Sequence, residues 1–119
     1  MYATTNGTTL TLHEGKPDLA AMQTAVGGYI TTADRWPSPE RENVTVDVWC
    51  NDEGLLENLP IYWIRRLDAQ PIAGNLCITA TDETEGETIS ATEREIHTAL
   101  AFTLVSEEEL RAALRKTTV

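Results

Sequence analysis

The stretch Val44-Thr45-Val46-Asp47-Val48-Trp49-Cys50 is the clearest strand signal in this chain. Apolar residues occupy every second position, and valine is a β-branched residue that fits a pleated, half-buried surface. A turn signal, Asn51-Asp52-Glu53-Gly54, follows directly. The pattern predicts a strand within an antiparallel sheet, with Val46 and Val48 buried and a turn at its end.

Shorter runs on either side of this stretch resemble further strands. The Asn6-Gly7 dipeptide indicates a tight turn between two of them, because both residues tolerate positive φ. The predicted strands are Tyr2–Thr5, Thr8–Leu12, Tyr29–Thr32 and Leu76–Thr81. Residues 35–42 carry two prolines and are predicted to form a polar loop. Residues 60–67 are compatible with a strand or a short helix, and helix is favoured.

One short helix is predicted between the strands Thr8–Leu12 and Tyr29–Thr32. Asp18 is a suitable N-cap, Met22 and Val26 share one face, and Gly27-Gly28 can close the helix in the left-handed conformation. Residues 96–104 leave two readings open, a continuous helix or a helix followed by a strand.

Two matches to the S-x-x-E capping box predict helices near the end of the chain, one at Ser90–Glu93 and one at Ser106–Glu109. In the second, acids lie at the start and bases at the end, as the helix dipole prefers. The expected fold is therefore α+β, a small mixed but mainly antiparallel sheet with two to four short helices, including a C-terminal helix.

The 119 residues fit one domain, in which 82–119 form an acidic C-terminal extension. No apolar run approaches the roughly 20 residues of a membrane span, and no secretion signal is visible, so we expect a bacterial host cytosolic protein without membrane contact. The net charge of −10 argues against direct nucleic-acid binding, because phosphate contacts need basic side chains.

Recognisable catalytic and metal-binding patterns are missing from the sequence. His13 and His97 lack partners at metal-ligand spacing, and phosphate-loop and nucleophile-elbow motifs do not occur. Cys50 and Cys77 each lie in an apolar run, so two reduced core thiols are expected, with a disulfide as the alternative. We expect no enzyme activity, no cofactor and no metal.

Two groups of residues are candidate binding sites. Residues 82–109 hold nine of the nineteen acidic residues. They form either a protein-docking surface or a run of solvated charges. A docking surface of this kind could mimic the phosphates of a nucleic acid. The candidate partner-binding residues are Asp82, Glu83, Glu85, Glu87, Glu93, Glu95, Glu107, Glu108 and Glu109. Arg65 and Arg66, beside Trp63, are a candidate anion or nucleotide site through charge and stacking, unless they pair with surface acids.

Several segments together resemble the domain of unknown function 3846 family, small uncharacterised proteins of bacteriophages and mobile elements. The resemblance runs from about Leu10 to about Glu95, and its most distinctive part is the Q-x-x-V-G-G-Y-I segment at 23–30. The other segments are Glu14–Pro17, Asn51–Gly54, Leu59-Pro60 and Ile72–Asn75. The chain departs from the family pattern in Tyr62-Trp63 and in a longer C-terminal extension. The family has no assigned catalytic residues, and the resemblance implies a phage or prophage origin and an accessory role.

These observations favour a non-enzymatic accessory protein that acts by stoichiometric binding to a host or defence protein. One alternative is a homo-oligomer that binds or sequesters a small ligand such as a nucleotide. Another alternative is a virion structural component. Fold class alone does not choose among them.

Overall fold

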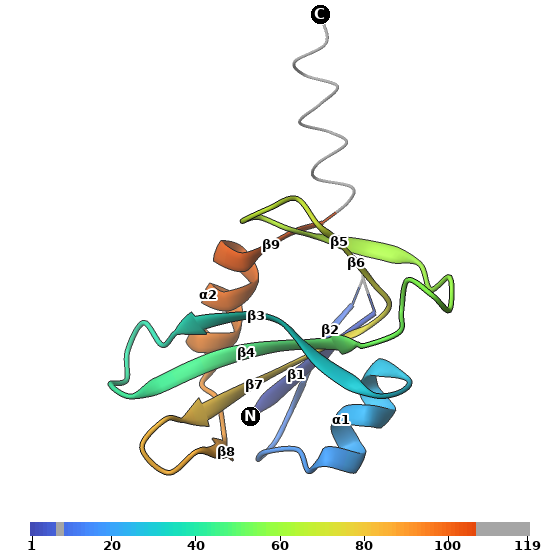
Figure 1. Ribbon diagram of the computed structural model, residues 1–119. Coiled ribbons are helices and arrows are strands. Elements are labelled where there is room, and N and C mark those ends of the chain that lie inside the picture. Colours follow the sequence, from blue (N-terminus) through green and yellow to red (C-terminus); the bar gives the residue numbers. More distant parts are fainter. Residues whose placement is uncertain (7–8, 107–119) are drawn as a thin grey trace, which may run out of the picture.

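A computed structural model describes residues 1–6 and 9–106 of the chain (Figure 1). The elements in chain order are β1 (Tyr2–Thr5), β2 (Leu10–His13), α1 (Leu19–Val26), β3 (Ile30–Pro37), β4 (Val44–Asn51), β5 (Ile61–Arg65), β6 (Pro71–Ala73), β7 (Leu76–Asp82), β8 (Glu87–Ile89), α2 (Glu93–Thr103) and β9 (Leu104–Ser106). The strand expected over Val44–Cys50 is confirmed, and residues 96–104 form a helix followed by a strand. The helix expected from Ser106 falls mainly on 107–119, outside the described residues.

The main sheet has six strands in the order β2-β1-β7-β4-β3, and β8 pairs with β7 beside β1. Every strand pair within the described residues is antiparallel, so the sheet is not mixed. The predicted loop over 35–42 was wrong in its first part, because Arg35, Trp36 and Pro37 pair with β4. Pro37 ends β3, an edge strand, where a missing N–H is tolerated.

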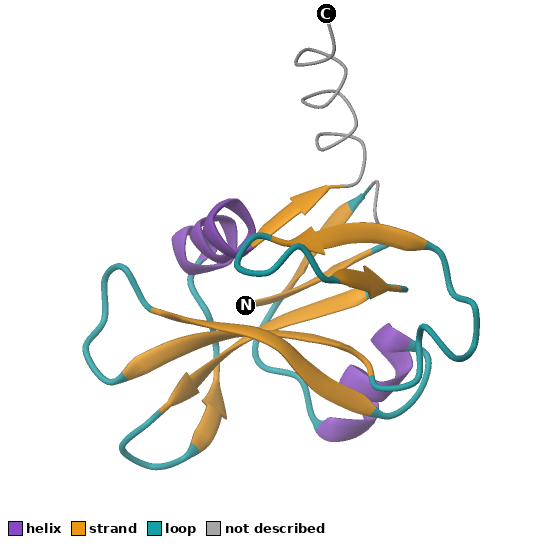
Figure 2. Cartoon of the chain, turned by 45° about the horizontal axis from the view of Figure 1, so that its top comes forward, coloured by secondary structure: helices purple, strands orange, loops and turns teal. Residues whose placement is uncertain are grey.

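A second sheet with the order β6-β5-β9 lies over the first (Figure 2). The helix favoured for 60–67 is therefore wrong, since Ile61–Arg65 is the central strand β5. Its partners are β6 and, some 40 residues further along the chain, β9, where Ile64 lies opposite Val105. Branched and aromatic residues fit this strand, but the distant partner that completes it leaves no local signal.

The larger core lies between the main sheet and α2. Val46 and Val48 of β4 and Ile78 of β7 are fully buried and pack with Ile96 and Ala99 of α2. The second sheet closes the same face through Ile72 and Trp63. The predicted burial of Val46 and Val48 is thus confirmed.

α1 lies on the opposite face of the sheet (Figure 2), and a smaller core lies beneath it. Met22 and Val26 of α1 pack on Cys77, with Trp49 at the margin. Residues alternate between the two faces of a strand, so Trp49 and Cys77 face α1 while their neighbours in sequence face α2. No helix in the described part of the chain has the length and apolar character needed to cross a membrane.

The ends of α1 follow the sequence signals. Asp18 Oδ1 accepts a hydrogen bond of 2.8 Å from the Ala21 amide, which confirms the N-cap. Gly27 adopts φ +80° in the left-handed region, and the amides of Gly27 and Gly28 both donate to the Gln23 carbonyl.

The two cysteines are free thiols, as expected. Cys77 lies opposite Trp49 in the β4–β7 register, so Cys50 is one residue out of step and faces the other side of the sheet. Burial raises the pKa of the Cys77 thiol to about 12. Burial raises the pKa of the Cys50 thiol, and the negative charge of Asp52 raises it by a smaller amount.

Thiol labelling at pH 8 should distinguish these two environments. In a Cys50→Ser variant we expect Cys77 to resist a thiol reagent for hours, because it is fully buried and almost entirely protonated. In a Cys77→Ser variant, half-buried Cys50 should react faster. In guanidinium chloride the two variants should react at equal rates, and rapid native labelling of Cys77 would contradict its placement.

Substitution of Ile78 should measure the larger core. Ile78→Ala is expected to lower the free energy of unfolding by about 2–5 kcal/mol, because the side chain is fully buried in the central strand. Leu56→Ala removes a side chain that is 84% exposed and should change it by about 0.5 kcal/mol or less. Urea unfolding measures both, and equal effects would show that this strand is not central to the core.

Candidate functional site

The predicted acidic residues fall into four groups, of which buried Glu95 is described separately below. Glu83, Glu85 and Glu87 are exposed on the hairpin that joins β7 to β8, and Glu93 is exposed in the first turn of α2. Asp82 is half-buried at the end of β7 and accepts a hydrogen bond from the Thr84 amide within the turn. Glu107, Glu108 and Glu109 lie outside the described residues.

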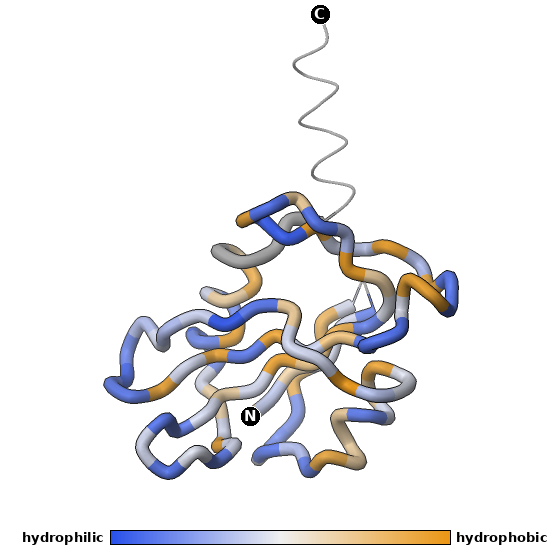
Figure 3. The backbone as a smooth tube through the Cα atoms, viewed as in Figure 1, coloured by the Kyte–Doolittle hydropathy of each residue, from blue (hydrophilic) through white to orange (hydrophobic). Residues whose placement is uncertain are grey.

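A second acidic hairpin lies beside the first. β4 pairs with β7 so that Val44 lies opposite Asp82, and the Glu83 amide donates to the Asn43 carbonyl at 2.8 Å. This pairing brings exposed Glu40 and Glu42, from the β3–β4 loop, next to the β7–β8 turn. We call this group of residues the acidic end, which comprises Glu40, Glu42, Asp82, Glu83, Glu85, Glu87 and Glu93. The backbone of the β3–β4 and β7–β8 turns is coloured mainly as hydrophilic in Figure 3.

Sequence reasoning missed Glu40 and Glu42 because they lie about 40 residues before the acidic segment. They fall in the loop that was predicted to be polar, which was the only local signal. Their place at the acidic end follows from the β4–β7 register.

Glu95 does not belong to this surface, contrary to the prediction. Its side chain is fully buried and receives the Arg41 guanidinium, with Nη2 at 2.5 Å from Oε1 and Nε at 3.0 Å from Oε2. The Ser38 hydroxyl donates to the same carboxylate at 2.5 Å. This cluster, which we call the Arg41–Glu95 clasp, ties the β3–β4 loop to the start of α2.

The capping box at the start of α2 is two residues later than predicted. The Thr92 hydroxyl accepts from the Glu95 amide at 3.1 Å, and Glu95 Oε1 accepts from the Thr92 amide at 2.8 Å. Thr92-x-x-Glu95 therefore replaces Ser90-x-x-Glu93 as the reciprocal pair. The sequence offers both overlapping matches, and the burial of Glu95 against Arg41 selects the second.

The electrostatics of the clasp keep Glu95 ionised. Burial alone would raise the pKa of Glu95, but hydrogen bonds from Arg41, Ser38 and the Thr92 amide outweigh it, and the pKa falls below the ordinary 4.5. The hydrogen bond to Glu95 raises the pKa of Arg41 against the effect of its own burial. The pair is thus charged over the neutral pH range.

The arginines near the acidic end are each held by a carboxylate. Arg35 Nε lies 2.6 Å from Oδ1 of fully buried Asp47, Arg41 is held by Glu95, and Arg94 lies 3.9 Å from Glu40. Among the described residues, no ion pair is formed by Glu42, Glu85 or Glu87. The surface therefore presents carboxylates whose charge is not cancelled locally.

The predicted anion site is not assembled. Arg65 lines a cleft of about 450 Å³, but its guanidinium lies 3.6 Å from both Asp34 and Asp68. Arg66 instead donates to the Ala101 carbonyl at 2.9 Å, and Trp63 packs against the larger core. Neither Arg66 nor Trp63 lines that cleft.

Metal-binding geometry is not found either, since no group of three or more His, Cys, Asp or Glu side chains within 1–6 and 9–106 is placed so that it could hold a metal ion. His13 stacks on Tyr2, with ring centroids 4.6 Å apart, and its Nε2 lies 2.8 Å from the Thr4 hydroxyl. His97 lies 3.5 Å from Glu93, one turn away on α2.

The chain is thus a small domain of antiparallel sheets and two described helices, with an acidic surface at one end of its main sheet. It belongs to the family described as Domain of unknown function (DUF3846), whose model matches residues 2–103. No curated protein and no solved structure matches the chain.

The segments that carry the family resemblance fix the backbone. Gly27 closes α1, and a Cβ at Gly54 would come within 2.8 Å of the Ala73 carbonyl oxygen. The buried side chain of Asn51 donates from Nδ2 to the Val26 carbonyl at 3.2 Å, and its Oδ1 accepts from the Glu53 backbone amide at 2.8 Å. These residues join α1, β4 and β6, so the segments that carry the resemblance are ones that stabilise the fold.

Because of the clasp, the free energy of unfolding should depend on pH in the acidic range. The Glu95 pKa is lower in the folded state than in the unfolded chain, so its stabilisation is present above about pH 4.5 and is lost as pH falls through the folded-state value. Glu95→Gln should lower the free energy of unfolding by about 1–3 kcal/mol at pH 7 and reduce the fall in stability below pH 4.5. Denaturant unfolding between pH 3 and 7 measures both effects.

Glu57→Gln serves as the matched control, because Glu57 is an exposed glutamate outside the clasp. It should leave the stability and its pH profile close to those of the natural chain. If Glu95→Gln and Glu57→Gln gave the same profile, the clasp would contribute nothing to acid stability.

Proposed function

We propose that this protein is a non-enzymatic phage or mobile-element accessory protein that binds a host or defence protein stoichiometrically through the acidic end. The observation that carries the proposal is the convergence of exposed carboxylates from the β3–β4 loop, the β7–β8 turn and the start of α2. Three of them, Glu42, Glu85 and Glu87, have no ion pair with another described residue. Family membership supports an accessory role, as the resemblance implies.

The acidic end is held in a defined shape before any partner arrives. The Thr45 hydroxyl donates to Glu83 at 2.6 Å, and the Arg41–Glu95 clasp fixes the loop that carries Glu40 and Glu42. A preorganised charged surface loses less entropy on binding and attracts an oppositely charged partner over distance. The expected partner is a basic protein surface, and the association should be salt-sensitive.

The nucleotide-binding alternative has less support. An anion at the Arg65 cleft would have to compete with Asp34 and Asp68, which lie within ion-pair distance of the guanidinium. Arg66 does not share that cleft, so no second guanidinium reinforces it.

Charge reversal at the acidic end should test the protein-docking proposal. We expect Glu42→Lys, Glu85→Lys and Glu87→Lys together to slow association with the partner about tenfold or more at low salt, with little change in dissociation rate. The matched control reverses three exposed glutamates elsewhere, Glu14, Glu53 and Glu57, and makes the same change in net charge.

The measurement begins with capture from a bacterial host lysate by the natural chain and both triple variants, with mass spectrometry of retained proteins and small molecules. A genuine partner is retained by the natural chain and the control but lost from the acidic-end variant. Biosensor kinetics on that partner then give the rates. Equal slowing by both variants would show that only net charge matters, and unchanged binding by the acidic-end variant would remove this surface from the mechanism.

A further inference from the structure

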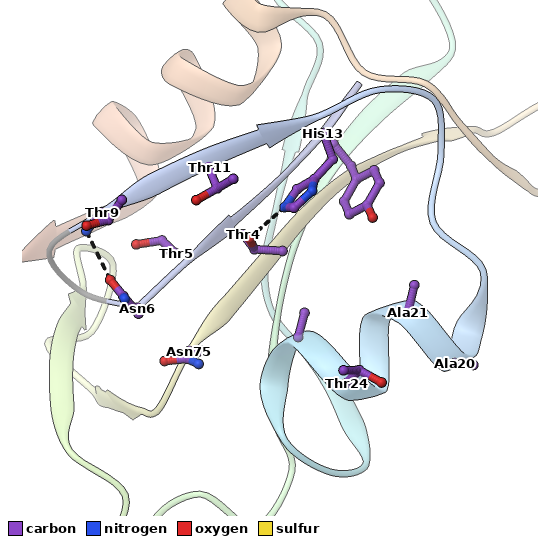
Figure 4. A pocket seen from close by; sticks show the side chains of 12 residues that line it. Thr4, Thr5, Asn6, Thr9, Thr11, His13, Ala20, Ala21, Thr24 and Asn75 are labelled. Atoms are coloured by element: carbon purple, nitrogen blue, oxygen red, sulfur yellow. Dashed lines mark hydrogen bonds between the residues drawn. The ribbon is translucent and has the colours of Figure 1, made fainter.

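A pocket of about 490 Å³ lies between the β1–β2 hairpin and α1 (Figure 4). It is at the other end of β7 from the acidic end, since Asn75, which precedes β7, lies on its wall. Its volume falls within the range of about 300–1,000 Å³ that small-molecule sites occupy. Nothing in the proposed docking at the acidic end uses this pocket.

The pocket exists because the facing side of α1 carries small residues. Ala20, Ala21 and Ala25 line it, whereas Met22 and Val26 turn into the core beneath the helix. Alanine side chains reach too short a distance to fill the space below the hairpin. The helix is nevertheless held in place by its core contacts and by both caps, so the pocket has a fixed floor.

The opposite wall is formed by polar side chains. Threonines of the β1–β2 hairpin, including Thr4, Thr9 and Thr11, line the pocket together with Asn75 and His13 (Figure 4). None of the described lining residues is Asp, Glu, Lys or Arg. Hydroxyl and carboxamide groups can each donate and accept hydrogen bonds, and the imidazole of His13 adds a further hydrogen-bonding group.

An aromatic pair forms part of the same wall. The rings of Tyr2 and His13 both line the pocket, stack with an interplanar angle of 14°, and are fixed by the hydrogen bond between His13 and Thr4. Such a wall offers apolar contact beside the hydroxyls. An anionic ligand would lose its hydration here without gaining a Lys or Arg partner among the described lining residues, and the net charge of −10 would further oppose it.

We propose that this pocket binds an uncharged, hydroxyl-rich ligand containing a sugar ring, either a free saccharide or a nucleoside. Sugar hydroxyls both donate and accept, which matches the threonine and asparagine groups, and the Tyr2–His13 pair supplies a surface for a ring. A ligand that carries phosphate is disfavoured, because the described lining residues include no Lys or Arg and the net charge of −10 repels an anion. The site is thus distinct in chemistry from the Arg65 cleft.

The test is a titration of the isotope-labelled chain, followed by amide NMR shifts, with ribose, glucose, sucrose, adenosine and cytidine, and with the 5′-monophosphates of the two nucleosides. We expect at least one neutral compound to shift amides of β1, β2 and α1 together, and its phosphorylated form to bind at least tenfold more weakly. Comparing the saccharides with the nucleosides shows which of the two sources of a sugar ring the pocket binds. No shifts with any compound at millimolar concentration, or equal binding of a phosphorylated form, would overturn the proposal.

Two pairs of variants locate the binding in this pocket. Ala20→Phe should fill the pocket and weaken binding at least tenfold, whereas Leu19→Phe, on the neighbouring residue outside the pocket, should not. Thr11→Val should weaken binding several-fold, whereas Thr32→Val, an exposed threonine on the other edge strand, should not. Binding that survives both Ala20→Phe and Thr11→Val would place the ligand elsewhere, and the NMR spectrum itself reports whether each variant is folded.

Discussion

β7 is hydrogen-bonded along both edges, with β4 on one side and β1 and β8 in succession on the other. It is also covered on both faces at its centre, so its polar side chains must find partners inside the protein. β4 supplies them, because the Trp49 indole donates to the Thr79 hydroxyl at 2.8 Å and Asp47 accepts from the Thr81 hydroxyl at 2.5 Å. The register between β4 and β7 therefore sets the core and also determines which hairpin ends lie together.

Two fully buried carboxylates, Asp47 on β4 and Glu95 on α2, shape the charge of this end of the sheet. Each is compensated by an arginine from the β3–β4 hairpin, Arg35 or Arg41. A buried carboxylate without such a partner would be costly, so loss of either arginine should destabilise the fold. Glu83 and Glu40 have only long ion pairs of 3.9 Å, with Arg35 and Arg94. Glu42, Glu85 and Glu87 form no ion pair with another described residue, so the surface charge here is a consequence of how the buried carboxylates are compensated.

Much of the fold could be predicted because its signals are local. The strand at 44–50 shows its period within seven residues, and α1 carries both of its caps in sequence. β5 could not be predicted because β9, about 40 residues later, completes it. The acidic surface was only partly predicted for a related reason: composition shows where carboxylates are dense, but not that Glu95 meets Arg41 from 54 residues earlier. The pocket beside α1 could not be predicted from the sequence, because it depends on small residues of α1 lying opposite the β1–β2 hairpin.

The segments that carry the resemblance noted in the sequence and the residues of the acidic end are at different positions, and this difference has a physical basis. Gly27, Asn51 and Gly54 are constrained by backbone conformation or close approach, so substitution there would disturb the fold itself. The exposed glutamate side chains at the hairpin ends carry no such constraint and can change while the sheet persists. The pocket and the acidic end are separated by the length of β7, roughly 20 Å at about 3.3 Å per residue. β7 pairs with β4 from Cys77 to Asp82 between them, so the two sites lie at opposite ends of one strand ladder.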